Sequence, residues 1–317
     1  MRYAELPAHR LMIRDFARTE AFRKGIEAAV RPGDVVLDAG AGSGILALLA
    51  ARAGARRVYA VEPTPAAEVI PRLARANGVQ DVVRTLRSPA EAVLIPEPVD
   101  VVVSEWMGSI GVDENLLGMV LRARDRFLRP GGRMVPRRVA AWMAPAGLSM
   151  RPDVDFFRDR PYGLDLSPFQ EPSVHELLCR GRRVESGNLR AAPRPLWTTD
   201  TRTARAADAL LPARGEARFV ARKRGTVNCL VAWFRAELSP GVLLANAPGA
   251  PDTHWGQLAL PLRAPIRLEP GQVLEAKVTC IPAGRERSHL AWSVRAGGGA
   301  WEHHDTRVHG PSPAPQA

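Results

Sequence analysis

Lysine, cysteine and long apolar runs are scarce in this chain of 317 residues, and each scarcity excludes a class of protein. No apolar run approaches the roughly 20 residues of a membrane-spanning helix, and MRYAELPAHR at the N-terminus has no signal-peptide core. The cysteines, Cys179, Cys229 and Cys280, are far apart and form no Cys-x-x-Cys pair, so neither a disulfide framework nor a zinc site is supported. We expect a soluble, cytoplasmic protein with reduced, packed thiols and no membrane partner.

Positive charge comes almost entirely from arginine, because Lys24, Lys223 and Lys277 are the only lysines in a chain with a formal net charge of +11. A balance this basic is typical of proteins that bind nucleic acid or another polyanion. The preference for arginine, together with abundant Ala, Gly and Pro, is also typical of a compositional bias of the coding sequence. We interpret the arginines as scattered and solvated, and we expect no nucleic-acid partner.

The first part of the chain alternates short apolar runs with helical patterns. Residues 11–30 predict one amphipathic helix or two short ones, and 114–132 predicts a strong helix stopped by Pro-Gly-Gly. Strands that are apolar on both faces and alternate with helices predict a doubly wound parallel sheet of the Rossmann type, which we assign to residues 1–136. The predicted strands are VVLDAG (35–40), RVYAVEP (57–63), VVRTLR (82–87) and PVDVVVSE (98–105).

From Arg137 onward the apolar residues follow a period of two or occur in short runs between Pro, Gly and Asp turns. This pattern predicts an antiparallel sandwich or barrel over 137–310. A proline-rich insert interrupts it and contains the helix-like stretch VHELLCRG at 174–181, and the tail at 311–317 is predicted to be disordered. Near the C-terminus, His303, His304 and His309 could be read as a metal tract, but we interpret them as solvated and predict no metal site.

A glycine-rich turn follows the first predicted strand. VVLDAGAGSGIL places Asp38 at the strand end and then Gly40, Gly42 and Gly44 before a helix. Glycines suit a tight turn where a ligand must approach backbone N–H groups at a helix N-terminus. Such a turn is shared by binders of NAD, FAD and S-adenosylmethionine. Glu62 ends the next strand, where a carboxylate can accept hydrogen bonds from both ribose hydroxyls, so we predict a nucleoside-containing cofactor.

Two glutamates follow the fourth predicted strand. SEWMGSIGVDENLL, residues 104–117, sets Glu105 and Glu114 nine residues apart in a glycine-bearing loop. Such a pair could bind a metal, act in acid/base catalysis or grip a cationic substrate. A metal site would need further ligands, and none is clustered here.

Two distant loops give the chain a specific resemblance to the protein arginine methyltransferases. SEWMG with its second glutamate resembles the family's double-E loop, and D-THW-GQ at 252–257 resembles its THW loop. The glycine turn, which reads Asp-x-Gly-x-Gly-x-Gly, is similar to motif I of class I S-adenosylmethionine methyltransferases. The resemblance implies a Rossmann-like S-adenosylmethionine-binding domain, an antiparallel β-barrel and an inserted dimerisation arm at 167–190. It also implies methyl transfer to the guanidino group of arginine.

The resemblance also implies roles for individual residues. Glu105 and Glu114 would hold the substrate guanidinium, beside an Asp–His pair formed by Asp15 and His254. Arg18 would meet the carboxylate of S-adenosylmethionine, and Glu91 its adenine amino group. The full cofactor set would be His9, Met12, Arg18, Asp38, Gly40, Gly42, Gly44, Glu62 and Glu91, with Tyr3, Met107 and Trp255 on the substrate side.

Departures from the family pattern leave the substrate open. Only Tyr3 remains of the family's Tyr-Phe-x-x-Tyr element, and small residues at 111–113 stand where the family shows larger ones. From the resemblance we expect the substrate to be an arginine-containing protein or peptide, or alternatively a small guanidine or biosynthetic intermediate. A non-catalytic binding protein of the same fold is a third hypothesis. We also expect a homodimer, because Phe169, Val174, Leu177 and Leu178 would make the insert too apolar to stay uncovered.

Overall fold

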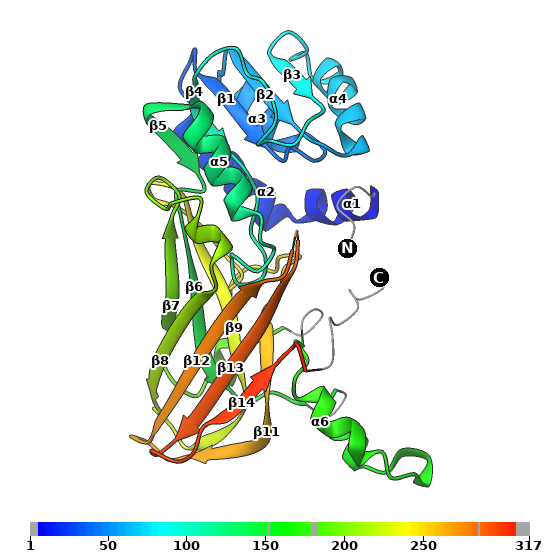
Figure 1. The fold of residues 1–317 in the computed structure, drawn as a ribbon, viewed down its shortest axis with the longest axis vertical. Helices are drawn as coiled ribbons and strands as arrows, with labels where there is room; N and C mark the ends of the chain where they lie inside the picture. The colour runs from blue at the N-terminus through cyan, green and yellow to red at the C-terminus, as the bar shows by residue number, and fades with distance from the viewer. Residues whose placement is uncertain (1–5, 151–152, 179–182, 285, 309–317) are drawn as a thin grey trace.

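The computed structural model describes residues 6–150, 153–178, 183–284 and 286–308, which form an α/β domain above a long antiparallel barrel (Figure 1). Tyr3, Cys179, His309 and the tail at 311–317 lie outside the described residues. Within the described part of the chain, no helix is long and apolar enough to cross a membrane.

A five-stranded parallel sheet forms the centre of the α/β domain. Its order is β3-β2-β1-β4-β5, and all neighbouring strands run parallel. Every residue of β1 and β4 is buried, which agrees with strands that are apolar on both faces. The predicted doubly wound sheet is therefore confirmed. Its strands are β1 (Val35–Ala39), β2 (Arg57–Val61), β3 (Val83–Leu86), β4 (Val99–Val103) and β5 (Leu128–Val135).

The N-terminal helical pattern forms two helices, and Asp15 is the break between them. Asp15 caps the second helix, because its side chain accepts a hydrogen bond from the backbone N–H of Arg18. The helices of this domain are α1 (Leu6–Arg14), α2 (Phe16–Ala29), α3 (Ile45–Arg52), α4 (Ile70–Ala76) and α5 (Leu117–Phe127), with a 3₁₀ turn η1 (Pro65–Val69) before α4.

One predicted helix boundary was wrong. Helix α5 ends at Phe127, and the Pro-Gly-Gly sequence at 130–132 lies inside β5 instead of stopping the helix. Leu128 already has extended dihedral angles, and β5 pairs with β4 across a register shift between Val99 and Val101. Leu128 and the residues from Arg133 onward pair with β4, and residues 129–132 lie in the register shift between them, where a strand can hold extra residues.

The second half forms two antiparallel sheets that share a core. One has the order β10-β9-β6-β7 with β11 paired to β9, and the other is β14-β13-β12-β8. Side chains from both, including Phe219, Leu260 and Trp292, meet in the interior, as an antiparallel barrel requires. The strands are β6 (Arg138–Ala146), β7 (Arg194–Asp200), β8 (Ala213–Val220), β9 (Gly225–Ser239), β10 (Val242–Ala245), β11 (Leu258–Leu268), β12 (Val273–Pro282), β13 (Ser288–Ala296) and β14 (Glu302–Asp305).

The interpretation of the C-terminal histidines as a solvated group was wrong for His304. His303 and His304 belong to β14, and the His304 ring is buried and stacked on Trp292 at 4.9 Å between ring centroids. Its Nδ1 lies 2.9 Å from the carbonyl oxygen of Val174, and its Nε2 lies 2.6 Å from Glu302 Oε1. The ring thus joins β14 to Val174, the residue that follows the short helix Gln170–Ser173.

The insert stands away from the barrel as a short arm (Figure 1). We define the arm as residues 155–173, which begin earlier than the predicted insert. Phe156, Tyr162, Leu164 and Phe169 are exposed on it. The arm consists of η2 (Asp155–Arg158), η3 (Pro161–Gly163), η4 (Ser167–Phe169) and α6 (Gln170–Ser173); further short turns are η5 (Ser186–Asn188) and η6 (Asp208–Leu210).

Two predictions after the arm were wrong. The stretch 174–178 forms turns and a single bridge instead of a helix, and 179–182 lie outside the described residues. Val174 is buried within this chain, while Leu177 and Leu178 pack against the barrel cores. These three side chains therefore do not form an uncovered surface, and Phe169 is the one of the four that does.

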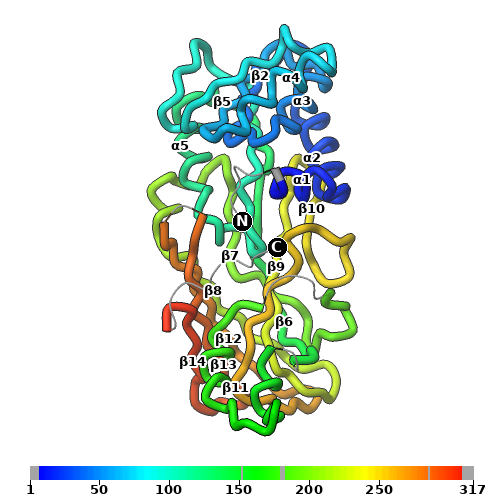
Figure 2. The backbone as a smooth tube through the Cα atoms, turned by 90° about the vertical axis from the view of Figure 1, so that its right-hand side faces the viewer, coloured from blue at the N-terminus to red at the C-terminus, as the bar shows by residue number. Residues whose placement is uncertain are grey.

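Helix α2 joins the two halves. It packs against β9 and β10 of the barrel, as Figure 2 also shows. Gly25 lies against Leu238, and its carbonyl oxygen accepts a hydrogen bond from Ser239 Oγ at 2.7 Å. Phe22 and Ile26 are fully buried on the same helix. This contact places the start of α2, and with it Asp15, at the junction of the domains.

We expect Gly25→Ala to lower the free energy of unfolding by about 1–2 kcal/mol. The new Cβ would lie 2.8 Å from Leu238 Cβ, and overpacking outweighs the roughly 1 kcal/mol that alanine gains in a helix. Gly118→Ala in α5 is the matched control, because its nearest neighbour would be the flexible end of Arg122 at 3.3 Å. Urea unfolding measures both variants. Equal stability of Gly25→Ala and the parent would contradict this packing.

Candidate active site

A cavity of about 110 Å³ lies where α1, α2, the glycine turn and the loop between β4 and α5 meet. The loop, residues 104–116, is called the double-E loop below. Both of its glutamates line this cavity together with most of the residues predicted to hold the cofactor. The predicted residues in its wall are His9, Met12, Arg18, Gly40, Gly42, Glu62, Glu105 and Glu114.

The glycine turn and Glu62 form the wall on the side of the parallel sheet. Gly42 N–H donates to Glu62 Oε2 and Thr64 N–H to Glu62 Oε1, each at 2.8 Å. Gly40, Gly42 and Gly44 all have positive φ, and a Cβ on Gly42 would lie 3.1 Å from the His9 ring. Gly40 and Gly42 line the cavity and leave the backbone there bare, while a Cβ on Gly44 would lie 2.9 Å from the Ile70 side chain. A buried carboxylate beside such a turn suits a ribose.

Asp38 lies behind the turn, at the end of β1, and is fully buried. Burial raises the pKa of its carboxyl group to about 7, and the nearby charge of Glu62 adds to this, while the backbone N–H of Ala47 and the charge of Arg18 oppose it. This carboxyl group is therefore half protonated near neutral pH.

Glu105 is held from two sides. Arg18 donates to Glu105 Oε2 from Nη2 at 3.2 Å and from Nε at 3.4 Å, and Met107 N–H donates to Oε1 at 2.9 Å. Both members of the ion pair are largely buried. The sequence resemblance assigned Arg18 to the cofactor and did not predict this contact with Glu105.

Asp15 and His254 form the predicted pair across the domain junction. Asp15 Oδ2 accepts the His254 backbone N–H at 2.8 Å and lies 2.8 Å from His254 Nδ1, while Oδ1 accepts the Arg18 backbone N–H at 2.9 Å. Burial alone would raise the pKa of Asp15, but the hydrogen bonds from His254 and Arg18 outweigh it and lower the pKa. The carboxylate is therefore ionised and holds His254 in a fixed orientation.

Trp255 connects the THW loop to the double-E loop. Its Nε1–H donates to the carbonyl oxygen of Met107 at 2.7 Å, and Ser109 Oγ donates to the Trp255 carbonyl oxygen at 3.2 Å. The indole packs edge-on against Phe234, with 4.9 Å between ring centroids. Met107 and Trp255 are buried behind the cavity wall, so they support Glu105 and do not themselves line the cavity.

The small residues of the double-E loop have a structural reason. Asp113 accepts the backbone N–H groups of Ser109 and Ile110 at 3.0 and 2.9 Å, which closes a tight turn. A Cβ on Gly108 would lie 2.5 Å from the Asp113 carboxylate, and one on Gly111 would lie 2.9 Å from a methyl group of Val139. The small residues at 111–113, which differ from the family pattern, therefore allow the loop to turn tightly and to pack against the barrel.

Glu91 is not among the described residues that line the cavity, and its place beside the cofactor stays a prediction. Its side chain is 43% exposed and lies 3.9 Å from Arg122. The preceding residue, Ala90, lines the cavity instead. Sequence reasoning also missed Met119, one helical turn beyond the double-E loop, and Glu286, which comes from a barrel hairpin and has no local signal.

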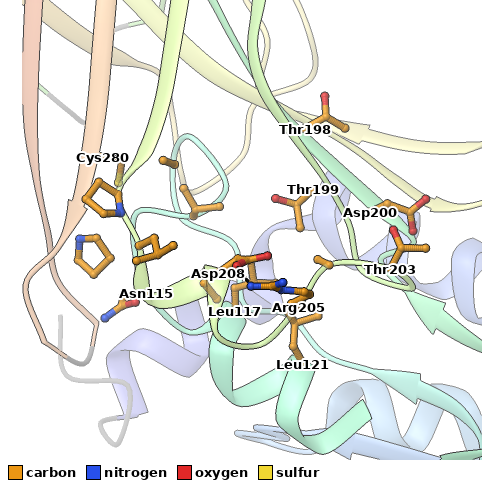
Figure 3. A pocket seen from close by; sticks show the side chains of 17 residues that line it. Asn115, Leu117, Leu121, Thr198, Thr199, Asp200, Thr203, Arg205, Asp208 and Cys280 are labelled. Carbon is orange, nitrogen blue, oxygen red and sulfur yellow. Dashed lines mark hydrogen bonds and ion pairs between the residues drawn. The ribbon is translucent and has the colours of Figure 1, made fainter. Parts of the chain in front are cut away.

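A larger cavity of about 580 Å³ lies between the second half of the double-E loop, α5 and the barrel (Figure 3). Val112, Asn115 and Leu117 line it from the loop and α5, and Thr198 and Cys280 line it from the barrel. Burial raises the pKa of Cys280 to about 12, so its thiol is not ionised. None of the predicted site residues lines this cavity. The smaller cavity is the candidate active site because of its chemistry and not its size.

Comparisons with known proteins agree with this geometry. A family model described as the arginine methyltransferase oligomerization subdomain matches residues 146–295, and one described as ribosomal protein L11 methyltransferase matches residues 18–115. Probable protein arginine N-methyltransferase 6 of Arabidopsis thaliana is 32% identical over 330 residues, covering 87% of this chain and 73% of that protein. Human protein arginine N-methyltransferase 2 is 32% identical, covering 92% of this chain and 71% of that protein.

Solved structures show the same architecture. The Trypanosoma brucei PRMT1 enzyme–prozyme heterotetrameric complex with AdoHcy has a TM-score of 0.85 at 29% identity, covering 96% of this chain and 98% of that one. Protein arginine methyltransferase 10 of Arabidopsis thaliana has a TM-score of 0.83 at 26% identity, covering 96% and 99%. Fold and site together define a methyltransferase-type α/β domain joined to a barrel. The chain belongs to the protein arginine methyltransferase family, which confirms the resemblance found in the sequence.

We expect Asp38 to make the ligand-free protein less stable as the pH rises from about 4 to 7. Its raised pKa means that the native state keeps a proton that the unfolded chain has released. This group therefore contributes a slope of about −1.4 kcal/mol per pH unit to the free energy of unfolding. Asp38→Asn removes the slope, because an amide does not titrate. Urea unfolding at pH 5, 6 and 7 tests this, and identical slopes in both proteins would contradict it.

Proposed function

We propose that this chain is an S-adenosylmethionine-dependent N-methyltransferase that modifies the guanidino group of arginine in a protein or peptide. The observation that carries this proposal is that Glu105 and Glu114 line the same cavity as the glycine turn and Glu62. Curated relatives that match most of the chain are named protein arginine N-methyltransferases. Their names support a protein or peptide substrate over a small guanidine.

The cavity suits S-adenosylmethionine. The Trypanosoma brucei relative was solved with AdoHcy, the demethylated form of this cofactor. In this chain Glu62 offers a buried carboxylate for the ribose, and Gly40 and Gly42 leave the backbone bare for close approach. Arg18 is a buried cation that suits a carboxylate ligand. When bound, S-adenosylmethionine supplies an electrophilic methyl group.

The two glutamates suit a guanidinium substrate. A guanidinium stays protonated and spreads its charge over three nitrogens, so it is a poor nucleophile. A carboxylate about 4 Å away stabilises it by roughly 4 kcal/mol at an effective dielectric constant of 20. Two carboxylates also orient its plane and draw positive charge toward the nitrogens they bind, which leaves electron density on the third. Glu105 is fixed for this task by Arg18 and Met107.

A proton must leave the guanidinium during methylation. Glu105 and Glu114 are carboxylates next to it in this proposal, and His254 is a second acceptor whose orientation Asp15 fixes. Because Nδ1 of His254 faces Asp15, its Nε2 is the nitrogen available for proton transfer.

We expect Glu105→Gln and Glu114→Gln each to reduce methyl transfer about a thousandfold. The amide keeps the shape of the side chain and discards the charge, whose roughly 4 kcal/mol corresponds to that change in rate. The dissociation constant for S-adenosylmethionine should stay within a few-fold, because Glu62 and the glycine turn are untouched. Initial rates on arginine peptides and calorimetry measure the two effects.

Glu216→Gln is the matched control for charge, because Glu216 is exposed on β8 and pairs with Lys277. Its rate should equal that of the parent. A Glu105→Gln or Glu114→Gln enzyme with near-normal turnover would show that these are ordinary loop carboxylates.

We also propose that the chain divides into two domains near residue 136 and that the protein is cytoplasmic. A cofactor domain at 1–136 and a substrate domain at 137–310 are supported by the end of β5 at Val135 and the start of β6 at Arg138. Cys229 and Cys280 are buried free thiols, as a reducing compartment favours.

We also propose that the protein is a homodimer whose arm packs on the helical half of its partner. The matched family model is an oligomerization subdomain, and one relative forms a heterotetrameric complex. The arm exposes Tyr162, Leu164 and Phe169, while Leu11 on α1 and Phe16 on α2 expose apolar surface on the helical half. Joining two such surfaces removes both from water.

We expect light scattering to give a dimer at micromolar concentration and Tyr162→Glu to give a monomer. Tyr162 is 90% exposed, so its replacement changes the proposed interface without disturbing the core of the chain. Leu210→Glu is the control, because Leu210 is exposed on η6 between β7 and β8, away from the arm. A monomeric parent protein would refute the proposal.

A further inference from the structure

A buried asparagine stands where the pairing of β9 and β10 ends. The last residue of β10, Ala245, lies opposite Arg235, and the next residue is Asn246, which is 1% exposed. From there the side chain replaces the ladder, because Asn246 Oδ1 accepts the backbone N–H of Phe234 at 2.8 Å. The Asn246 carbonyl oxygen accepts a hydrogen bond from Gln257 Nε2 at 2.8 Å. Both ends of this residue are therefore fixed to the barrel.

The amide nitrogen of Asn246 reaches two loops of the candidate active site. Its Nδ2 donates to the carbonyl oxygen of Ser109 in the double-E loop at 2.9 Å and to the carbonyl oxygen of Gly256 in the THW loop. Ser109 lies between the two glutamates of its loop, and Gly256 lies two positions after His254. One buried side chain thus fixes the distance between the loop that carries both glutamates and the loop that carries the histidine.

The direct contacts between the two loops do a different job. The hydrogen bonds of Trp255 with Met107 and Ser109 join the loops to each other. Asn246 joins both loops to β9, because the same amide group that meets their carbonyl oxygens also meets Phe234. The loops are therefore held both together and at one place on the barrel.

An amide suits this position for a chemical reason. The site needs one acceptor for a backbone N–H and two donors for carbonyl oxygens, and an asparagine side chain supplies all three. These partners also fix which way the amide is turned. A carboxylate has nearly the same shape but no donor, and it would place negative charge beside two carbonyl oxygens. Asn246 is not among the described residues that line the active-site cavity, so its influence passes through the two loops.

We propose that Asn246 is a positioning residue for methyl transfer, which anchors the double-E loop and the THW loop so that both glutamates and His254 face one guanidinium. The inference rests on the proposed function. Its loss changes the geometry of the reacting groups, and small displacements of such groups lower kcat steeply. The cofactor wall stays in place, because the glycine turn and Glu62 belong to the parallel sheet.

The test compares Asn246→Asp with a matched asparagine on the same strand. Asn228 also uses its amide to hold a loop, because it accepts the backbone N–H of Leu148 and donates to the Leu148 carbonyl oxygen. It lies six positions before Phe234 on β9, which is about 20 Å along a strand. We expect kcat of Asn246→Asp on arginine peptides to fall about 10–100-fold, with the dissociation constant for S-adenosylmethionine within twofold. Asn228→Asp should lose stability in urea but keep kcat within about twofold of the parent.

A second variant and a second measurement make the result independent of folding yield and of turnover. Asn246→Ala removes all three side-chain hydrogen bonds without adding a charge, and we expect the same fall in kcat. Hydrogen exchange followed by mass spectrometry reports the loops directly. Exchange should become faster at 104–116 and 252–257 in both Asn246 variants and stay unchanged there in Asn228→Asp.

Three results would overturn the inference: a kcat of Asn246→Ala within twofold of the parent, unchanged exchange in both loops, or a change confined to KM. An equal fall in kcat for Asn228→Asp would also overturn it, because the loss would then follow general stability. A parent protein that binds S-adenosylmethionine but methylates no arginine peptide would refute the proposed function instead. Faster exchange in the Asn246 variants would still support the anchoring of the loops in that case.

Discussion

The buried carboxylate of Asp15 is the contact on which the site depends. One oxygen caps α2, and the other holds the backbone and ring of His254 from the barrel. A single ionised group thus starts a helix, joins two domains and orients a candidate proton acceptor. The same helix carries Arg18 to Glu105, so an error in the docking of α2 would displace both walls of the cavity. The close contact of Gly25 with Leu238 keeps that docking tight.

The double-E loop is rigid for reasons that lie mostly outside it. Trp255 holds it from the THW loop, and Asn115 holds the β12–β13 hairpin. Within the loop, Asp113 closes the turn with two backbone hydrogen bonds. Preorganisation of this kind matters for a substrate that must present one nitrogen in a defined direction. These contacts also explain how the loop is held in place although residues 111–113 are small.

Electrostatics in this protein differ between the surface and the cavity. The chain is strongly basic, yet the charged residues described in the cavity wall are mainly carboxylates: Glu62, Glu105, Glu114 and Glu286 against Arg18. Two buried acids that do not line the cavity differ in pKa: that of Asp15 is lowered by its hydrogen bonds, and that of Asp38 is raised to about 7 by burial. An acidic cavity in a basic protein favours cations that reach it and disfavours a general attraction of cationic chains, since exposed charges are screened within about 8 Å.

The sequence alone determined the first four strands of the parallel sheet, the glycine turn and the two glutamates, because these depend on local periodicity and spacing. It did not determine that Pro-Gly-Gly would lie in β5 or that His304 would be buried, because each depends on neighbours distant in the chain. Only the tertiary structure placed Arg18 on Glu105 and brought Glu286 to the cavity. These contacts join segments that are far apart in the chain, and they depend on the docking of α2 against the barrel and on the hydrogen bond from Asn115 to Gly284.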